Sequence, residues 1–203
     1  MRKRVKVFVV LATLAVCLLS LTGVAAALSF SADVVSFDNG QTMTMKFWMT
    51  TAGGSKIRTE MVQDGMAMAT IMRMDKMVIW MLMLKEKMYM EYVINPTSPQ
   101  YQRSQVATAE PTPDETTRVW ILNEVVNTYK SDKYRIDYRN QPSHYVWMSG
   151  DPGIMMEVKS AALDNKWWRE YRNISLAEPD AALFEIPAGF TKMDMKGMMN
   201  FGR

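Results

Sequence analysis

The sequence predicts a predominantly β domain in which antiparallel strands follow one another as a meander. Apolar and polar residues alternate over short stretches, which is the period of a strand with one buried face. Turn signals such as Asp38-Asn39-Gly40 and Asp64-Gly65 separate these stretches at intervals of ~8–12 residues. Thirteen of the 21 methionines lie between Met43 and Met90, and within each stretch they keep to alternate positions.

The first half of the chain divides into six expected strands, each bounded by turn residues. The third of them sets Ile57, Thr59 and Met61 against Arg58 and Glu60 on the other face. The fifth is apolar at odd and even positions alike, so we expect a central strand that is covered on both faces, with either packed chain or a ligand against the second face. The six expected strands span residues 29–37, 41–50, 56–63, 66–74, 77–84 and 88–94.

The second half begins with a polar, proline-containing stretch, residues 95–115, that predicts a long surface excursion. Pro113-Asp114-Glu115 is typical of a helix start and predicts a short helix to Leu122. Further strands are expected at 133–138, 144–149, 154–160 and 167–174, followed by one helical turn at 179–184. From Thr191 the sequence is rich in Met and Lys, and we expect a frayed tail.

The N-terminal 27 residues have the pattern of a secretory signal peptide. A basic segment, residues 1–6, precedes an apolar run, and Ala25-Ala26-Ala27 supplies small residues for cleavage near Ala27. An uncleaved anchor helix is the alternative, because the run approaches the length of a membrane span. Lipidation at Cys17 is a third alternative, although Val16 and the position inside the apolar run disfavour it.

Removal of this leader changes what the composition implies. The leader holds four basic residues and no acidic one, so the formal net charge of +3 becomes about −1. The basic charge is therefore no sign of nucleic-acid binding. Cys17 is the single cysteine, so the mature chain has neither disulfides nor thiolate sites.

The methionines are predicted to share one face of the sheet, because same-parity residues of a strand point the same way. Three interpretations follow: a loosely packed core, an adaptable pocket for acyl chains or another apolar ligand, and a thioether site for Cu(I) or Ag(I). The candidate ligand-binding side chains on this face are Met43, Met45, Phe47, Met61, Met68, Met72, Met81 and Met90.

No catalytic constellation is present in the sequence. The single histidine, His144, has no partner motif and is expected at the surface. Neither a zinc-binding pattern, a phosphate-cradling glycine loop nor a nucleophile elbow occurs. We therefore assign no catalytic residue, cofactor or metal ligand and do not expect an enzyme.

Several short stretches resemble the lipoprotein-localisation carriers of the bacterial envelope, the LolA/LolB-like superfamily. They include Lys56-Ile57-Arg58-Thr59-Glu60, Asp75-Lys76-Met77-Val78-Ile79-Trp80 and the closing Phe184-Glu185-Ile186-Pro187-Ala188-Gly189-Phe190. The resemblance implies a strongly curved antiparallel sheet, an incomplete β-barrel, with short helices over its mouth. It also implies a cavity for acyl chains, with Arg58 the candidate for cargo handling near the mouth.

Together these observations predict an exported, monomeric periplasmic protein that binds or carries an apolar or acylated ligand or a lipoprotein. Transient membrane contact is left open, and no nucleic-acid partner is expected. A soft-metal-binding or purely structural envelope protein is the alternative. The expected organisation is a signal peptide at 1–27, a LolA-like β domain at 28–193 and a flexible tail at 194–203.

Overall fold

The computed structural model describes residues 28–97, 115–151, 154 and 156–193. These residues form one large, mostly antiparallel sheet and one short 3₁₀ helix, η1 (Ala181–Phe184). The predicted signal peptide (residues 1–27), most of the predicted surface excursion (residues 98–114) and the predicted tail (residues 194–203) lie outside the described part. The strands are β1 (Ser29–Asp38), β2 (Gln41–Thr50), β3 (Lys56–Gln63), β4 (Met66–Arg73), β5 (Val78–Met83), β6 (Met88–Val93), β7 (Glu115–Val126), β8 (Tyr129–Tyr138), β9 (His144–Ser149), β10 (Glu157–Ala162), β11 (Trp167–Ser175) and β12 (Thr191–Lys192).

The meander predicted for the first half is confirmed, since β1 to β6 follow one another as neighbours in the sheet. The hairpin turns are built as their sequences indicate. Asn39 and Gly40 both have positive φ, 50° and 79°, as do Asp64 and Gly65, at 51° and 76°. Such turns match the right-handed twist of the strands that they join.

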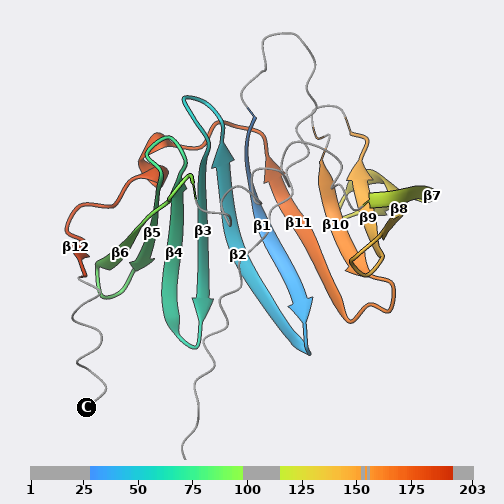
Figure 1. Ribbon diagram of the computed structural model, residues 1–203, viewed down its shortest axis with the longest axis horizontal. Coiled ribbons are helices and arrows are strands. Elements are labelled where there is room, and N and C mark those ends of the chain that lie inside the picture. Colours follow the sequence, from blue (N-terminus) through green and yellow to red (C-terminus); the bar gives the residue numbers. More distant parts are fainter. Residues whose placement is uncertain (1–27, 98–114, 152–153, 155, 194–203) are drawn as a thin grey trace, which may run out of the picture.

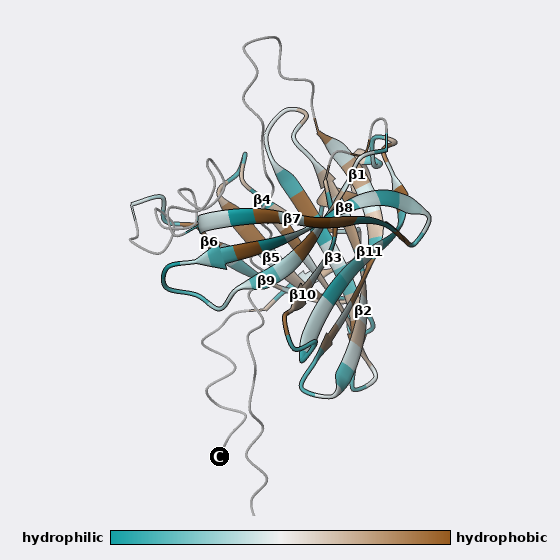
Figure 2. Ribbon diagram, turned by 90° about the vertical axis from the view of Figure 1, so that its right-hand side faces the viewer, coloured by the Kyte–Doolittle hydropathy of each residue, from teal (hydrophilic) through white to brown (hydrophobic). Residues whose placement is uncertain are grey.

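The sheet order is β12-β6-β5-β4-β3-β2-β1-β11-β10-β9-β8-β7. The first and last meanders meet in the middle, where β1 pairs with both β2 and β11. The sheet is strongly curved and twisted, and β7 crosses one end of it at a steep angle (Figures 1 and 2). The predicted incomplete barrel is confirmed, because no pairing in the described part of the chain closes the sheet.

The prediction of a short helix at 113–122 is wrong over the described residues, because Glu115–Val126 forms strand β7. Its Thr, Val, Ile and Trp side chains favour extended backbone, and β8 supplies a continuous hydrogen-bonding partner. Two register shifts interrupt this pairing, near Thr117 and Leu122. The outer edge is apolar (brown in Figure 2), and Val119, Trp120 and Val125 are exposed.

Two further expectations are corrected at the other edge of the sheet. The chain from Thr191 does not simply fray, because Thr191–Lys192 pairs parallel with β6 as β12. The fifth strand is covered on only one of its faces. Trp80 and Leu82 are buried, whereas Met81 on the other face is 38% exposed.

The covering on that face is the segment that contains η1, which packs across β3 to β6. Asp180 caps η1 by accepting a hydrogen bond from the backbone N–H of Ala182. Phe184, 1% exposed, fills the centre of an apolar cluster with Ile71 and Leu82. The helical turn predicted at 179–184 is therefore confirmed, and it serves to bury one face of the sheet.

Among the described residues, no helix is long and apolar enough to cross a membrane.

Replacement of Phe184 by alanine should destabilise the fold by about 3–5 kcal/mol, because it leaves a large cavity under the C-terminal segment. Urea unfolding followed by tryptophan fluorescence measures this change. Val93→Ala, at a side chain that is 77% exposed, is the matched control and should change the free energy of unfolding by less than ~0.5 kcal/mol. An equal effect of both variants would contradict the packing role of Phe184.

Candidate functional site

The methionines of β2 to β6 form continuous cross-strand rows on one face, which we call the methionine face. Side chains directly opposite each other on neighbouring strands lie ~4.5–5.5 Å apart at Cβ, so the members of a row touch their neighbours. A second row places Thr70 beside Met81 and Met81 beside Met90. The principal row runs from β2 to β6 through Met45, Met61, Met68, Met83 and Met88.

This face is open over β3 to β6, in contrast to the face beneath the C-terminal segment. Met81 is 38% exposed and Met66 is 54% exposed, and the other methionines of these strands are half-buried. On the opposite face, Ile71 is 0% exposed and Leu82 is 1% exposed. Among the predicted ligand-binding residues, those that are half-buried are Met43, Met45, Met61, Met68, Met72 and Met90.

Toward the middle of the sheet the same face is a packed core. Phe47 is buried and its ring centroid lies 5.2 Å from that of Phe30. Ala32, Met49 and Tyr171 complete this cluster. The structure therefore gives Phe47 packing neighbours within the fold, whereas the methionines of β3 to β6 retain accessible surface.

Arg58 does not face the methionines, because it lies on the opposite side of β3. Its Nε donates a hydrogen bond of 2.8 Å to Glu60 Oε1, and its Nη1 donates one of 2.8 Å to the carbonyl oxygen of Leu183. Arg58 is thus a buried anchor for the C-terminal segment. The site that the sequence assembled from Arg58 and the methionines is divided between the two faces of the sheet.

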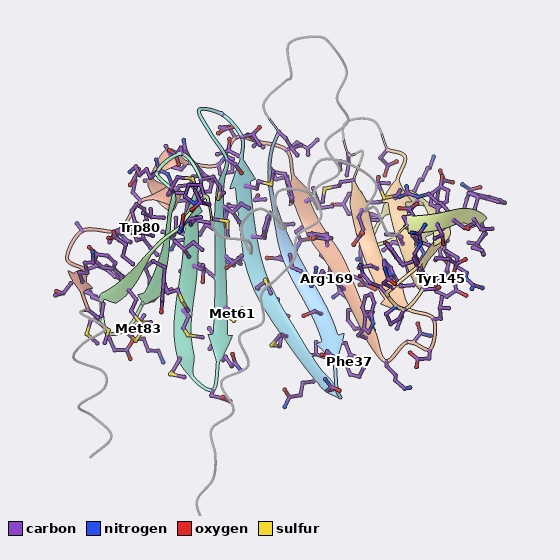
Figure 3. The ribbon with its side chains drawn as sticks, viewed as in Figure 1. Phe37, Met61, Trp80, Met83, Tyr145 and Arg169 are labelled. Atoms are coloured by element: carbon purple, nitrogen blue, oxygen red, sulfur yellow. The ribbon has the colours of Figure 1, made fainter. Side chains whose placement is uncertain are left out.

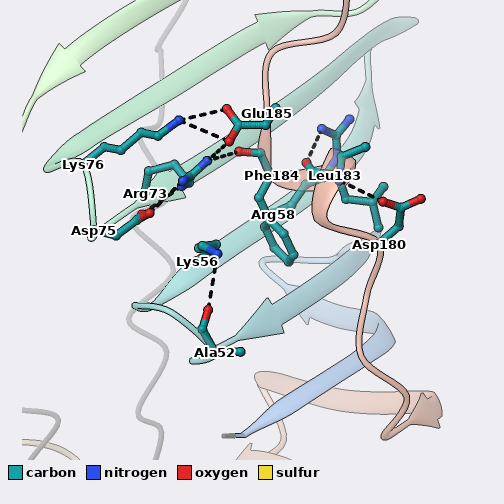
Figure 4. A network of polar contacts seen from close by, with 11 residues as sticks. Ala52, Lys56, Arg58, Arg73, Asp75, Lys76, Asp180, Leu183, Phe184 and Glu185 are labelled. Carbon is teal, nitrogen blue, oxygen red and sulfur yellow. Dashed lines mark hydrogen bonds and ion pairs between the residues drawn. The ribbon is translucent and has the colours of Figure 1, made fainter.

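Arg73 is a second buried anchor, and the sequence reasoning did not single it out (Figure 4). Its Nε and Nη2 donate to the two carboxylate oxygens of Asp75 at 2.8 and 2.6 Å. Its Nη1 donates to the carbonyl oxygen of Phe184 at 3.0 Å and also to Glu185. The available signal was the repeated Arg-x-acid spacing of Arg58-x-Glu60 and Arg73-x-Asp75, which places both members of each pair on one side of a strand.

The charges around Arg73 stabilise one another. The hydrogen bond from Arg73 lowers the pKa of the Asp75 carboxyl, more than burial raises it. Burial opposes the ionisation of Glu185, but hydrogen bonds from Arg73 and Lys76 outweigh it and lower the pKa of Glu185. Arg73 itself has a raised pKa, chiefly because of its hydrogen bond to Asp75. The C-terminal segment is therefore held by a fully charged network.

The other end of the sheet carries a different set of groups. His144, expected at the surface, is half-buried and stacks on Tyr138 with ring centroids 5.1 Å apart, and burial lowers its pKa. Lys133 lies over the rings of Tyr145 and Trp147. A shallow hollow of about 350 Å³ lies at the β7–β8 end, lined in part by Val125 and Asp132. It is separate from the methionine face of β3 to β6.

No group of three or more His, Cys, Asp or Glu side chains in the described part of the chain could hold a metal ion.

Comparison with known proteins places this architecture among solved structures but not in a sequence family. No family model matches the chain, and no curated protein matches its sequence. An uncharacterised conserved protein from Thermus thermophilus superposes with a TM-score of 0.55 at 6% identity, over 82% of this chain and 90% of that one. The structure of the MucA/MucB complex of Pseudomonas aeruginosa superposes with a TM-score of 0.51 at 14% identity, over 79% of this chain and 56% of that one.

A LolA superfamily protein from Nitrosomonas europaea is also matched, with a TM-score of 0.30 at 9% identity, over 78% of this chain and 90% of that one. The likeness to the Thermus protein and to the MucA/MucB complex is one of fold.

The Arg73 network predicts a specific pH dependence. Because the pKa of Asp75 is lower in the folded protein than the ~3.9 of an unfolded chain, its contribution is present above pH ~4 and is lost as the pH falls. Asp75→Asn should therefore lose less stability than the wild type between pH 5 and pH 2. Urea unfolding at a series of pH values measures the slope of the free energy of unfolding against pH for the variant and for the wild type.

Asp64→Asn, in the exposed β3–β4 turn, is the matched carboxylate-to-amide control and should keep the wild-type slope. Identical slopes for Asp75→Asn and the wild type would rule out the assigned role of Asp75.

Proposed function

We propose that this protein is a binding or carrier protein for a lipid-like or acylated ligand, which lies against the methionine face. The observation that carries the proposal is the row Met45, Met61, Met68, Met83 and Met88, five adjacent thioethers on a half-exposed part of the sheet. Unbranched, polarizable side chains adapt to ligands of irregular shape. The fold likeness to the MucB structures supports a binding role rather than a catalytic one.

The two faces of the sheet differ in a way that favours the methionine side. The opposite face of β3 to β6 is already occupied by Phe184 and its neighbours, and Arg58 and Arg73 hold that segment in place. An added ligand would have to displace this packing. On the methionine face an acyl chain would instead cover surface that is now exposed, and each buried methylene contributes about 0.8 kcal/mol.

The proposed setting is the bacterial cell envelope, with residues 1–27 as the export signal and cleavage near Ala27. We place the methionine face on the inner side of the curved sheet, away from the C-terminal segment. The ligand would be a free amphiphile or the acyl group of a lipoprotein. MucB has been crystallised in complex with MucA(peri), so a polypeptide ligand is one outcome that the following experiment would register.

Native mass spectrometry of the protein purified from an expressing bacterium should show a bound or exchangeable lipid-like molecule. The double variant Met61→Gln/Met68→Gln should bind a fluorescent fatty acid about tenfold more weakly or worse, because buried amides without partners cost ~1–3 kcal/mol. Fluorescence titration measures this affinity. The matched control is Val62→Gln, which changes an exposed side chain on the other side of β3 and should bind as the wild type does.

Protein that is consistently empty and takes up no fatty acid or lipopeptide at micromolar concentration would overturn the proposal. Equal loss of binding in the double variant and in Val62→Gln would contradict the assignment to the methionine face. A co-purifying polypeptide with no lipid would favour a protein ligand instead.

The principal row also favours a second candidate function, the binding of Cu(I) or Ag(I). Thioethers suit these soft ions, and neighbours in the row are close enough for two or three sulfurs to share one ion. Anaerobic titration with Cu(I) against a chelator of known affinity tests this candidate. The candidate is supported if the wild type competes with the chelator for Cu(I), and if this competition is lost in Met61→Gln/Met68→Gln but kept in Val62→Gln. Failure of the wild type to compete even with a weak chelator would exclude it.

A further inference from the structure

The methionine face is almost free of charge across β1 to β6. The one charged side chain on this face of the six strands is Asp38, at the hairpin end of β1, where its Oδ2 accepts a hydrogen bond from Asn39. The first cation met on the same face, moving from β6 toward β11, is Arg169. A single cation beside a wide apolar surface is the arrangement that an amphiphile with an anionic headgroup requires.

The strand register fixes the position of Arg169. Its cross-strand partners are Ser36 on β1 and Ser160 on β10, so two small side chains flank it. Ser36 in turn lies opposite Met43 on β2, two strands from Arg169 and therefore ~10 Å away. Figure 3 shows Arg169 near the centre of the sheet, with β1 and β2 between it and Met61. The distance suits a ligand whose headgroup lies on β11 and whose chain begins two strands away, at Met43 on β2.

The charge of Arg169 is only partly offset by its surroundings. None of the ion pairs within the described residues includes Arg169, whereas Arg58, Arg73 and Arg172 each have a carboxylate partner. Glu157 is the acidic group whose charge interacts with that of Arg169; burial raises the pKa of its carboxyl, while a hydrogen bond from Ser160 and the charge of Arg169 lower it. Tyr171 accepts a hydrogen bond from Arg169, and burial together with the proximity of Glu157 raises the pKa of Tyr171 to about 12, so the tyrosine is a neutral neighbour.

We propose that Arg169 binds the anionic headgroup of an amphiphile whose apolar chain lies on the methionine face. This inference rests on the proposed function and adds a ligand class to it: a carboxylate or a phosphate carried on a long alkyl chain. Ser36, which is half-buried, supplies a hydroxyl donor beside the guanidinium, whereas the hydroxyl of the buried Ser160 already bonds to Glu157. Arg169 thereby selects among ligands with the same chain, because neutral amphiphiles lack the charge-assisted hydrogen bonds that it offers.

Three probes with the same chain test the proposal: hexadecanoate, hexadecyl phosphate and hexadecanol, measured by competition against a fluorescent fatty acid. The wild type should bind at least one of the two anions tenfold or more tightly than the alcohol, and the tighter anion identifies the headgroup. Arg169→Gln should reduce this preference to within about twofold without weakening hexadecanol. Arg169→Lys should retain part of it, because the charge remains.

Arg172→Gln is the matched control, since Arg172 is also on β11 but pairs with Glu170 on the other face, and it should keep the full preference. A wild type that binds all three probes equally, or an Arg169→Gln variant that keeps the preference, would overturn the role of Arg169 and leave the proposed function standing. Binding of none of the probes would overturn both. Where Arg169→Gln does not fold, the wild type and Arg169→Lys still test the proposal, because equal binding of the three probes by the wild type, or a full preference in Arg172→Gln and none in the wild type, would overturn it.

Discussion

The strand register from β1 to β6 is the constraint on which the rest of the structure depends. Side chains alternate between the faces of a strand, so a slip of one residue at any of these pairings would move a whole set of methionines to the other side. The register is held from that other side. Arg58 and Arg73, which have the opposite parity to Met61 and Met72, bond to successive carbonyl groups of the C-terminal segment.

These two arginines link the packing of one face to the openness of the other. Each has a carboxylate two residues along the chain, which keeps its charge compensated while its remaining N–H groups satisfy the backbone of Leu183 and Phe184. A buried charge without such partners would be costly. With the network complete, Phe184 is fixed over Ile71 and Leu82, and the methionine face of β3 to β6 lies on the side of the sheet away from this segment.

The sequence predicted the first half of the fold well because its strands carry strong local signals. Asn39-Gly40 and Asp64-Gly65 specify hairpin turns, and parity assigns each methionine to a face, so the boundaries of β1 to β4 lay within one residue of expectation. The short helix expected after Pro113 was wrong because a local start signal competed with the β propensity of Thr116 to Val126 and with the pairing to β8. Pairing between distant segments, such as β12 with β6, leaves no local signal at all.

The candidate site was predictable only in part. Parity correctly indicated that the methionines share a face, but it could not indicate which face the C-terminal segment would cover, because that depends on a contact more than 100 residues away in sequence. The importance of Arg73 depends on its contacts with the distant C-terminal segment, and that of Arg169 on cross-strand neighbours that only the sheet order supplies. Phe47 has the same parity as the methionines, yet the pairing of β1 with β11 places it in a packed core.

The most direct test of the central claim, that the methionine face is the ligand-binding surface, uses methyl NMR of protein labelled with ¹³C at the methionine ε-methyl groups and at the Val and Leu methyl groups. A spin-labelled fatty acid broadens the resonances of nearby methyl groups. The account predicts selective broadening of Met61, Met68, Met81 and Met83, with the Leu82 and Val62 methyl groups on the opposite face unaffected. Broadening that centres on Leu82 and its neighbours, or that spreads evenly over both faces, would contradict it.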